Sequence, residues 1–579
     1  MRRARIVGAA ALLLLVTHGA RSQTGGGAEL EGLWQATKRF GPDVAGRLVI
    51  DRAGGGWRAS IAGRTAAVHV AGDSVAFALP DGSGAFTGRM RGGRIAGHWV
   101  QPPTVTDGMR FASPVVLEGC GTGCYAGTVT PRADEFTFYI QARRRPDGTL
   151  GAFIRNPERN LGRFMRLDRI ETADSTVRLL DARGQVITRG LLRDGVMTVY
   201  FPIRGGSYDF RRVPDDAFTF FYPRGRPAAS FAYAPPRDEG DGWPVGTLEE
   251  VGMARGPIEE LMRRLAGEAT DSIGALRVHG ILIARHGKLV VEEYFHGENR
   301  EKPHDTRSAS KSVATVLMGA AMQAGVDISP ETRVYSVLEP GVAQADARKR
   351  ALTVENLLTM SSGLDCDDNN DESPGSEEYV TQVQENPDWT RVVLGLGMIR
   401  APGDSAVYCS IQPYLAGAVL SRAAGRPLPE LMHELVGEPL GMRDYYVALA
   451  PLGEAYFGGG WRFRPRDFMK LGQLYLDGGV WRGRRILSED WVRRSSQPRY
   501  PMGRRARYGY LWWVWDYELG GRTIQAYFAS GNGGQEVMVV PALDLVIATY
   551  GGNYAEGAGF LAITELIPRY ILPAVVGRG

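Results

Sequence analysis

Ser308 and Lys311 have the spacing at which a lysine amine can activate a serine hydroxyl. A serine hydroxyl is a poor nucleophile until a neighbouring group removes its proton. Residues 308–323 have helical periodicity, and side chains three positions apart share a helix face, so the amine would lie beside the hydroxyl. Asp305 or Thr306 could cap this helix, whose positive end would favour negative charge on Ser308. The pair alone is also compatible with a solvated surface helix.

Tyr408 is the residue that could complete a proton transfer. It follows Pro402-Gly403 and precedes an expected helix at residues 413–423, so it lies in a turn. Free tyrosine and lysine have pKa values of about 10 and 10.4, so neither is a base at neutral pH. We expect a lysine cation to lower the pKa of Tyr408 and burial to lower the pKa of Lys311. The two side chains could then take the proton of Ser308 and pass it to a leaving group.

A glycine-rich segment between two apolar strands is the third candidate part of the site. Its substrate-binding candidates are Asn532, Gly533, Gly534 and Gln535. Glycines at a strand edge let a substrate approach the backbone closely. Acyl transfer also needs donors for the developing oxyanion, and the backbone N–H groups of Ser308 and Gln535 are the candidates. An ordinary glycine hairpin turn has the same pattern and is the alternative.

Other hydrolytic sites are not indicated. The only histidine after Ser308 is His433, in an apparent amphipathic helix at residues 428–440, where a structural role is expected. The chain contains neither G-x-S-x-G nor H-E-x-x-H, so we expect no Ser-His-Asp triad and no zinc. The proposed chemistry requires no metal or organic cofactor. The formal charge of +4, without a basic run, disfavours nucleic acid as a partner.

In their order along the chain these segments resemble the serine β-lactamase and penicillin-recognising superfamily. The motifs S-x-x-K, Y-x-N or Y-x-S, and K/H-x-G would correspond to Ser308-x-x-Lys311, Tyr408-x-Ser410 and Asn532-Gly533-Gly534. Residues 357–364 and 458–460 also resemble this family. The similarity extends from about residue 245 to the end and is greatest to class C β-lactamase-like esterases and 6-aminohexanoate-dimer hydrolases.

The resemblance implies a serine hydrolase that forms an acyl-enzyme on Ser308, with Lys311 and Tyr408 as acid and base and Ser410 on the substrate side. Asn532 replaces a lysine that pairs with a substrate carboxylate in typical β-lactamases, and Ser410 replaces their usual asparagine. We therefore expect a small-molecule ester, amide or short peptide as substrate. A slow penicillin-recognising binding or sensing protein is one alternative. A D-amino-acid peptidase is another, and it would need a carboxylate anchor that the sequence does not locate.

The N-terminus is expected to be a signal peptide, residues 1–22, with three arginines, a short apolar run and a small-residue cleavage site. Export to the periplasm or the medium follows, with an uncleaved anchor as the alternative. No later segment has the continuous apolar length of a membrane span, so stable insertion is not expected.

The mature chain is expected to contain two domains joined by a linker. Residues 24–232 have short alternating runs between glycine-rich turns, which predicts an all-β barrel or sandwich whose role and ligand the sequence does not reveal. Residues 233–245, rich in Pro, Gly and charge, predict a linker. Residues 246–579 are expected to be the hydrolase domain, of the α+β class, with an antiparallel sheet, flanking helices and a helical insertion.

Export would place the four cysteines in an oxidising compartment. Cys120 and Cys124 are close enough to bridge a turn, and Cys366 and Cys409 would then form the second pair. Buried free thiols are the alternative.

Two further features have a functional and a structural interpretation. The first is a set of tryptophans that could shape an apolar acyl pocket or pack in the core: Trp389, Trp512 and Trp513. The second is the acidic run at residues 365–378, which could attract amines to a cleft but is expected to be a solvated loop.

Overall fold

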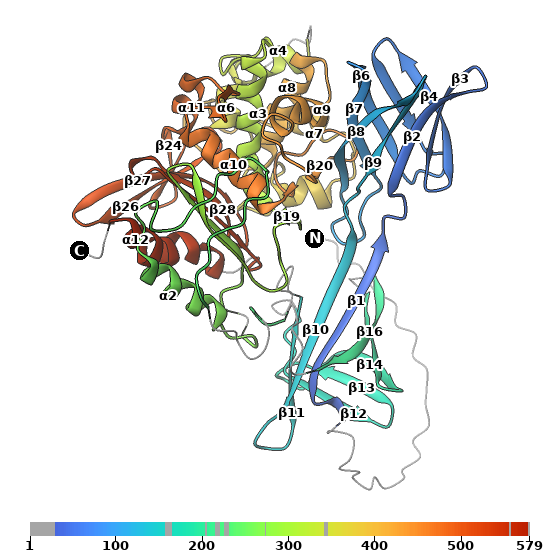
Figure 1. The fold of residues 1–579 in the computed structure, drawn as a ribbon, viewed down its shortest axis with the longest axis vertical. Coiled ribbons are helices and arrows are strands. Elements are labelled where there is room, and N and C mark those ends of the chain that lie inside the picture. The colour runs from blue at the N-terminus through green and yellow to red at the C-terminus, as the bar shows by residue number, and fades with distance from the viewer. Residues whose placement is uncertain are drawn as a thin grey trace.

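Two closed β-barrels precede an α+β domain in the computed structural model of the chain (Figure 1). The structure describes residues 29–156, 165–202, 205–214, 221–224, 231–272, 274–340, 346–554 and 557–576. The signal peptide expected at residues 1–22 lies outside these residues. The all-β part, expected as one barrel or sandwich, therefore consists of two barrels.

The first barrel is an antiparallel circuit in which β2 pairs with β9 and β9 pairs with β8. Its strands are β2 (Gly46–Ala53), β3 (Gly56–Ile61), β4 (Arg64–Ala71), β5 (Ser74–Ala78), β6 (Ala85–Arg91), β7 (Arg94–Gln101), β8 (Arg110–Gly121) and β9 (Cys124–Val129). Alternating side chains such as Leu48, Ile50 and Trp99 are buried in one cluster, so apolar packing closes this barrel.

The strands of the second barrel come before and after those of the first barrel in the sequence. Its strands are β1 (Gly32–Gly41), β10 (Asp134–Arg144), β11 (Leu150–Arg155), β12 (Arg169–Ala173), β13 (Thr176–Leu180), β14 (Val186–Arg193), β15 (Val196–Phe201) and β16 (Gly206–Val213). Because β1 pairs with both β10 and β16, the first barrel is inserted between the first two strands of the second. The alternating runs in the sequence predict β2, β3, β4, β5, β7, β10, β11, β13, β15 and β16, but not β1, β6, β8, β9, β12 and β14. Pro114 within β8 is one reason, since proline disfavours a strand.

The α+β domain has an eight-stranded antiparallel sheet in the order β18-β17-β29-β28-β27-β26-β25-β24. The strands are β17 (Val278–Arg285), β18 (Lys288–Tyr294), β24 (Tyr500–Met502), β25 (Ala506–Tyr508), β26 (Trp513–Leu519), β27 (Arg522–Gly531), β28 (Gln535–Val540) and β29 (Leu545–Gly551). Strand alternation divides the core into two layers. Val537 and Val539 belong to one apolar cluster, whereas Met538 and Val540 belong to the other.

Helices cover both faces of this sheet. One face packs on α2 (Arg255–Ala266), on the π-helical segment η8 (Ala562–Ile571) and on α12 (Leu572–Val576). The other packs on α3 (Lys311–Gln323) and α10 (Pro465–Leu476). The expected helical insertion lies between β18 and β24, and its other helices are α4 (Val334–Leu338), α5 (Ala347–Ala351), α6 (Val354–Leu358), α7 (Trp389–Gly395), α8 (Ile411–Ala424), α9 (Leu428–Met432) and α11 (Glu489–Ser496).

Three helix predictions need correction. The α-helix expected from residue 308 begins at Lys311, and Ser308 lies before it in a 3-10 turn, η3 (Arg307–Ser310). The helix expected at residues 428–440 is α-helical only to Met432 and continues as a π-turn. The apolar pattern also predicts a final helix over residues 560–572, and this helix is π-helical over most of its length. In all three segments, backbone hydrogen bonds join residues three or five positions apart where the α-helix joins residues four apart. The spacing of apolar residues in the sequence does not reveal this difference.

One prediction about membrane spans also needs correction. Among the described residues, Gly557–Val575 has the length and composition of a possible membrane span, although the sequence suggested none. Half of its most apolar window is buried, and Leu566, Ile567 and Ile571 pack in the core against α2. Burial of this kind is typical of a core helix.

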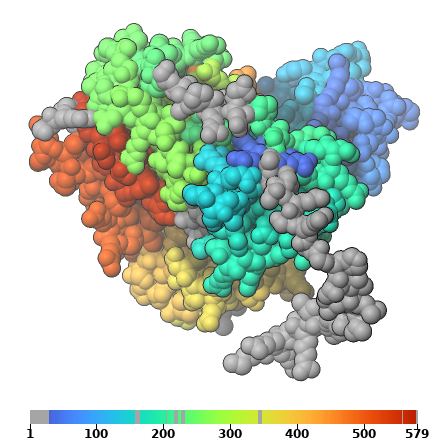
Figure 2. Space-filling view, turned by 90° about the horizontal axis from the view of Figure 1, so that it is seen from below, coloured from blue at the N-terminus to red at the C-terminus, as the bar shows by residue number. Residues whose placement is uncertain are grey.

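The barrels contact the α+β domain through backbone and side chains. A short strand of the insertion, β20 (Val447–Leu449), pairs with β8 of the first barrel. From the second barrel, Arg155 donates to the carbonyl of Thr270 at 2.9 Å, and the space-filling view shows this barrel against the α+β domain (Figure 2). The remaining short strands are β19 (His304–Asp305), paired with β21 (Arg462–Phe463), and β22 (Val480–Trp481), paired with β23 (Arg484–Arg485).

Residues 231–244 contain no helix or strand, in agreement with a connecting segment between the second barrel and α2. The domain bounds expected from the sequence remain a prediction.

Candidate active site

Lys311 and Ser308 are joined by a hydrogen bond, in which the Lys311 amine donates to the Ser308 hydroxyl oxygen at 2.9 Å. In the 3-10 turn η3, side chains three positions apart lie one above the other, so the turn brings the two groups together. Lys311 is 1% exposed and also donates to the carbonyl of Gly458, whereas Ser308 is only half-buried. The amine is thus buried, whereas Ser308 is partly accessible to solvent.

The backbone that leads into this turn is held by the side chain of Asp305. The Asp305 carboxylate accepts from the backbone N–H of Arg307 at 3.0 Å, whereas the Thr306 hydroxyl donates to the Trp461 carbonyl at 2.8 Å. Arg307 has a left-handed backbone conformation, φ 48°, which presents Ser308 on a tight turn. The prediction that Asp305 or Thr306 caps the helix was wrong, because neither η3 nor α3 has a side-chain capping hydrogen bond, and the Asp305 contact is a local turn that leads into η3.

Tyr408 lies beside the same amine, although 97 residues separate it from Lys311 in the chain. The Lys311 nitrogen is 5.0 Å from the centre of the Tyr408 ring. The structure therefore brings the hydroxyl, the amine and the phenol into one cluster, as expected from the sequence.

The pKa of Lys311 changes in the direction opposite to the one expected. Burial by itself lowers the pKa of the amine, but the negative charges of Tyr408, Glu377 and Asp368 outweigh burial and raise it. The expectation considered burial alone because the two carboxylates come from a distant segment. Lys311 is consequently held as a cation.

These carboxylates belong to the acidic run at residues 365–378, so the expectation of a merely solvated loop was wrong. Asp368 accepts from the Ser410 hydroxyl at 2.6 Å and from its N–H at 2.8 Å, and donates its own N–H to the Tyr408 carbonyl at 3.0 Å. Glu377 donates its N–H to Asp368 at 2.9 Å and accepts from the Tyr456 hydroxyl at 2.6 Å. The run is folded against Tyr408 and Ser410.

The predicted cysteine pairs are both confirmed, Cys120 with Cys124 and Cys366 with Cys409. The second disulfide joins the acidic run to the residue that follows Tyr408. The proximity of Cys366 and Cys409 to site residues in the sequence was a signal that could have assigned the run to the site.

The three tryptophans have different locations. Trp513 stacks on Tyr408 with ring centres 5.7 Å apart, and Tyr508 contacts the Tyr408 ring edge-on at 6.3 Å. Trp512 is buried against Tyr475, and Trp389 is buried against other aromatic rings. Trp513 alone among the three is part of the candidate site.

The glycine-rich segment is a hairpin turn that also packs on η3. At Gly531, the last residue of β27, a Cβ atom would lie 3.0 Å from the backbone nitrogen of Ala309, so a larger residue would displace the turn. Gly533 and Gly534 have φ values of 99° and 96°, which favour glycine. Gln535 is buried and donates to the Gly551 carbonyl at 2.6 Å, whereas Asn532 is exposed. The segment is therefore a glycine hairpin, as in the alternative interpretation, and its role in substrate binding stays a prediction.

His433 lies outside this cluster. With Glu430 and Arg94 it lines the contact between the insertion and the first barrel, where Glu430 pairs with Arg89 at 2.6 Å. Its location agrees with the structural role expected for it.

Comparison with known proteins shows what the α+β domain resembles. Residues 261–551 match the model of the β-lactamase family. The 6-aminohexanoate-dimer hydrolase of Paenarthrobacter ureafaciens is 24% identical over 247 residues, which are 41% of this chain and 59% of that protein. Esterase EstB of Burkholderia gladioli is 28% identical over 183 residues, 28% of this chain and 45% of that protein. The chain thus spans about half the length of these curated relatives.

Among solved structures, a family VIII carboxylesterase is 18% identical, with a TM-score of 0.43. The similar region covers 55% of this chain and 98% of that one.

Proposed function

The chain belongs to the β-lactamase family, and from this premise we propose that it is a serine hydrolase that cleaves small esters or amides through an acyl-enzyme on Ser308. The family membership agrees with the β-lactamase-like α+β fold expected from the sequence and observed after the all-β part. One observation carries the proposal: the amine of Lys311 lies 2.9 Å from the Ser308 hydroxyl and 5.0 Å from the centre of the Tyr408 ring.

In the proposed reaction Tyr408 acts as a phenolate paired with the Lys311 cation. The Ser308 oxygen attacks the carbonyl carbon of the substrate, and the hydroxyl proton moves to the phenolate oxygen of Tyr408, which becomes a neutral phenol. The backbone N–H groups of Ser308 and Gln535 would stabilise the negative charge on the carbonyl oxygen. The bond to the alcohol or amine then breaks, and the leaving group takes the proton from Tyr408. Water attacks the acyl-enzyme in the same way, releases the acid and restores Ser308.

The raised pKa of Lys311 supports a division of roles between the two partners. An amine that remains protonated cannot accept the proton of Ser308, so the phenolate oxygen of Tyr408 is the proposed acceptor. The Lys311 cation would then stabilise the negative charge that develops on the oxygens of Ser308 and Tyr408.

The names of the relatives support an ester or amide substrate, since one is an esterase and the other a 6-aminohexanoate-dimer hydrolase. Asn532, exposed at the hairpin turn, brings no positive charge, which supports a substrate other than a β-lactam. The alternative of a slow binding or sensing protein is not favoured, because the relatives are named as hydrolytic enzymes.

Labelling with a fluorophosphonate tests the proposal. We expect rapid covalent labelling of the full chain, lost in Ser308→Ala and retained in Ser310→Ala, a matched control in the same 3-10 turn. Ser310 donates its hydroxyl to the Arg307 carbonyl at 2.7 Å and makes no contact with Lys311 among its hydrogen bonds in the described residues. Labelling that persists in folded Ser308→Ala would overturn the assignment.

We also propose that the chain is exported. The two disulfides support this, because disulfides persist in oxidising compartments. The mass of the mature protein from a native host tests the prediction, which requires a chain that begins at Gln23.

A further inference from the structure

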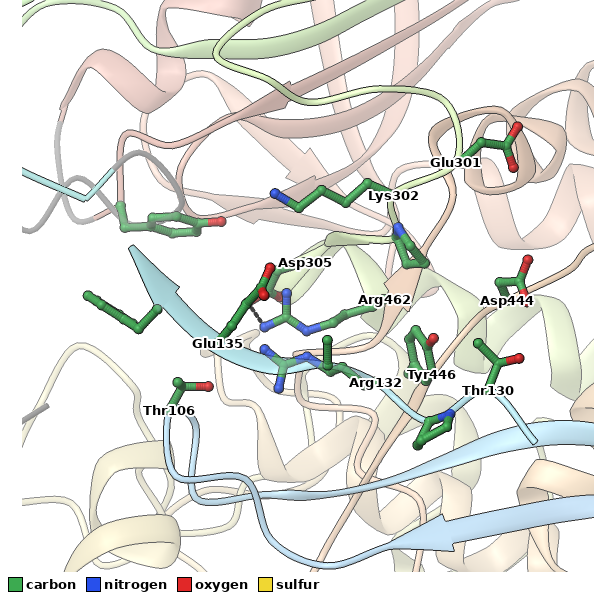
Figure 3. Close-up of a pocket in the computed structure, with 15 residues that line it drawn as sticks. Thr106, Thr130, Arg132, Glu135, Glu301, Lys302, Asp305, Asp444, Tyr446 and Arg462 are labelled. Carbon is green, nitrogen blue, oxygen red and sulfur yellow. Dashed lines mark hydrogen bonds and ion pairs between the residues drawn. The ribbon is translucent and has the colours of Figure 1, made fainter. Parts of the chain in front are cut away.

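A cavity of about 630 Å³ lies between the barrels and the α+β domain (Figure 3). One side is formed by the segment that joins the two barrels and begins β10, through residues 130–133, Glu135 and Phe136. The other is formed by residues 301–303, Asp305, Tyr446 and Arg462 of the α+β domain. Its volume is within the range of roughly 300–1,000 Å³ found for small-molecule sites, which often occur between domains.

The cavity adjoins the candidate active site. Asp305 lines it, and the same carboxylate accepts from the backbone N–H of Arg307, the residue before Ser308. Tyr554, another lining residue, stacks under the Arg307 guanidinium at 4.8 Å. A molecule in this cavity would therefore lie against the turn that carries the proposed nucleophile.

Two guanidinium groups from different domains meet at this cavity. Arg132, from the connection between the barrels, and Arg462, from the α+β domain, both pair with Asp107, at 2.7 and 3.1 Å. Both line the cavity with side chains that are 11% and 13% exposed. Nη1 of Arg132 and Nε of Arg462 are buried without an acceptor within the described ranges. Arg462 also pairs with Asp305 at 3.3 Å, so Asp107 and Asp305 share the two guanidinium groups and, among their buried nitrogens, leave only these two without an acceptor in the part of the chain that the structure describes.

The Arg132 cation pairs with Asp107 and is nevertheless destabilised by its surroundings. Burial and the neighbouring Arg462 cation lower the pKa of Arg132 to about 9, and the attraction of Asp305 and Asp134 does not offset them. The acidic residues at the rim, Glu135, Glu301 and Asp444, are exposed to solvent, which screens their charge. An additional negative charge inside the cavity would stabilise the Arg132 cation.

We propose that this cavity binds a carboxylate of the substrate, with Arg132 and Arg462 as its anchors. The description of the ligand as substrate rests on the proposed function of Ser308. Tyr446, Phe136 and Pro303 add apolar walls. The chemical class that fits is an N-acyl amino acid or a short peptide with a free C-terminal carboxylate.

Direct binding to the full chain carrying Ser308→Ala tests this without requiring turnover. The probes are N-acetylphenylalanine and its carboxamide, which differ only in the negative charge. By calorimetry we expect the carboxylate to bind about tenfold more tightly, the effect of one charge-assisted contact. Arg132→Gln should abolish the preference and Arg132→Lys should retain part of it. Arg143→Gln, an exposed arginine on β10, should leave it unchanged.

Equal binding of the two probes, or no binding of either, would overturn the inference. A preference that survives in both Arg132→Gln and Arg462→Gln would also overturn it. Should Arg132→Gln fail to fold, as judged by circular dichroism, Arg462→Gln carries the test. Fluorophosphonate labelling of Ser308 is measured separately, so the cavity and the nucleophile can fail independently.

Discussion

Cys366 and Cys409 form a disulfide that ties the acidic segment to the residue after Tyr408. Two residues beyond Cys366, Asp368 binds the backbone and hydroxyl of Ser410 and donates to the Tyr408 carbonyl. A covalent link and three hydrogen bonds thus hold the proposed proton acceptor over Lys311. The position of Tyr408 depends on this segment as much as on the helix that follows it.

Loss of this disulfide should impair catalysis. In Cys366→Ser with Cys409→Ser we expect kcat for an ester probe to fall by about 10-fold or more, because small displacements of a reacting group are costly. The matched control, Cys120→Ser with Cys124→Ser, removes the disulfide of the first barrel and should leave kcat unchanged. Equal effects of the two double variants on kcat would contradict the prediction.

Removal of the Tyr408 hydroxyl should slow acylation while the ring stacking on Trp513 is preserved. For Tyr408→Phe we expect the rate of fluorophosphonate labelling to decrease roughly 10²–10⁴-fold, the usual contribution of a general base. Tyr508→Phe, which keeps the edge-on ring contact with Tyr408, should change the rate little. A normal labelling rate in Tyr408→Phe would exclude the phenol as the proton acceptor.

Removal of the Glu377 charge should lower the pKa of Lys311. The carboxylate attracts the ammonium form, so without it burial has a larger effect, and the amine should lose its proton at a lower pH than in the parent chain. Lysine-selective NMR can measure this titration directly, because the chain contains only six lysines. Glu378→Gln, the exposed neighbour, is the control. An unchanged Lys311 titration in Glu377→Gln would show that another group holds the charge.

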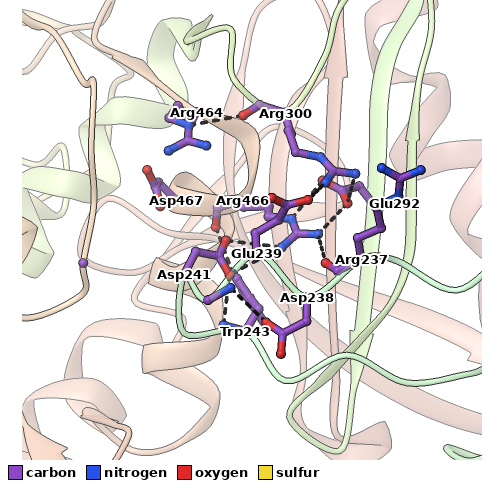
Figure 4. A network of polar contacts seen from close by, with 12 residues as sticks. Arg237, Asp238, Glu239, Asp241, Trp243, Glu292, Arg300, Arg464, Arg466 and Asp467 are labelled. Atoms are coloured by element: carbon purple, nitrogen blue, oxygen red, sulfur yellow. Dashed lines mark hydrogen bonds and ion pairs between the residues drawn. The ribbon is translucent and has the colours of Figure 1, made fainter.

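The connection between the barrels and the α+β domain should be important for stability (Figure 4). Arg466, 3% exposed, donates to Glu292 at 2.6 Å and to the Arg237 carbonyl at 2.7 Å, and pairs with Asp241 at 3.4 Å. Trp243 donates its indole N–H to the Arg466 carbonyl at 3.1 Å. The polar network therefore fastens the connecting segment to the domain.

Arg466→Ala should leave the buried Glu292 with a weaker set of partners, among them Arg300 at 3.2 Å. We expect the free energy of unfolding of the α+β domain to fall by about 3–5 kcal/mol. Arg493→Ala, which removes an exposed pair with Asp490, should cost about 1 kcal/mol or less. Urea titration followed by tryptophan fluorescence measures both, and similar midpoints for the two variants would argue against a stabilising network.

Several features of the fold and the site could be predicted from local sequence. The Ser308–Lys311 contact depends on a spacing of three, which brings side chains together in an α-helix and in a 3-10 turn alike, so the error in helix type did not matter. The hairpin of β17 and β18 and the strands β27, β28 and β29 were predictable because alternation and turn residues are local signals. The nesting of the barrels was not, since closure depends on the pairing of β1 with β16 across most of the all-β part.

The sequence by itself determined which groups could react: a hydroxyl, an amine and a phenol in a recognisable order, with cysteines that could form two pairs. Only the tertiary structure decided the charge state of the amine, because Asp368 and Glu377 reach Lys311 from a segment more than fifty residues away. Only the tertiary structure places Arg132, from the segment that joins the barrels, next to Arg462 and close to the turn that carries Ser308. Electrostatic interactions depend on distance in space, and a sequence specifies directly only the distance along the chain.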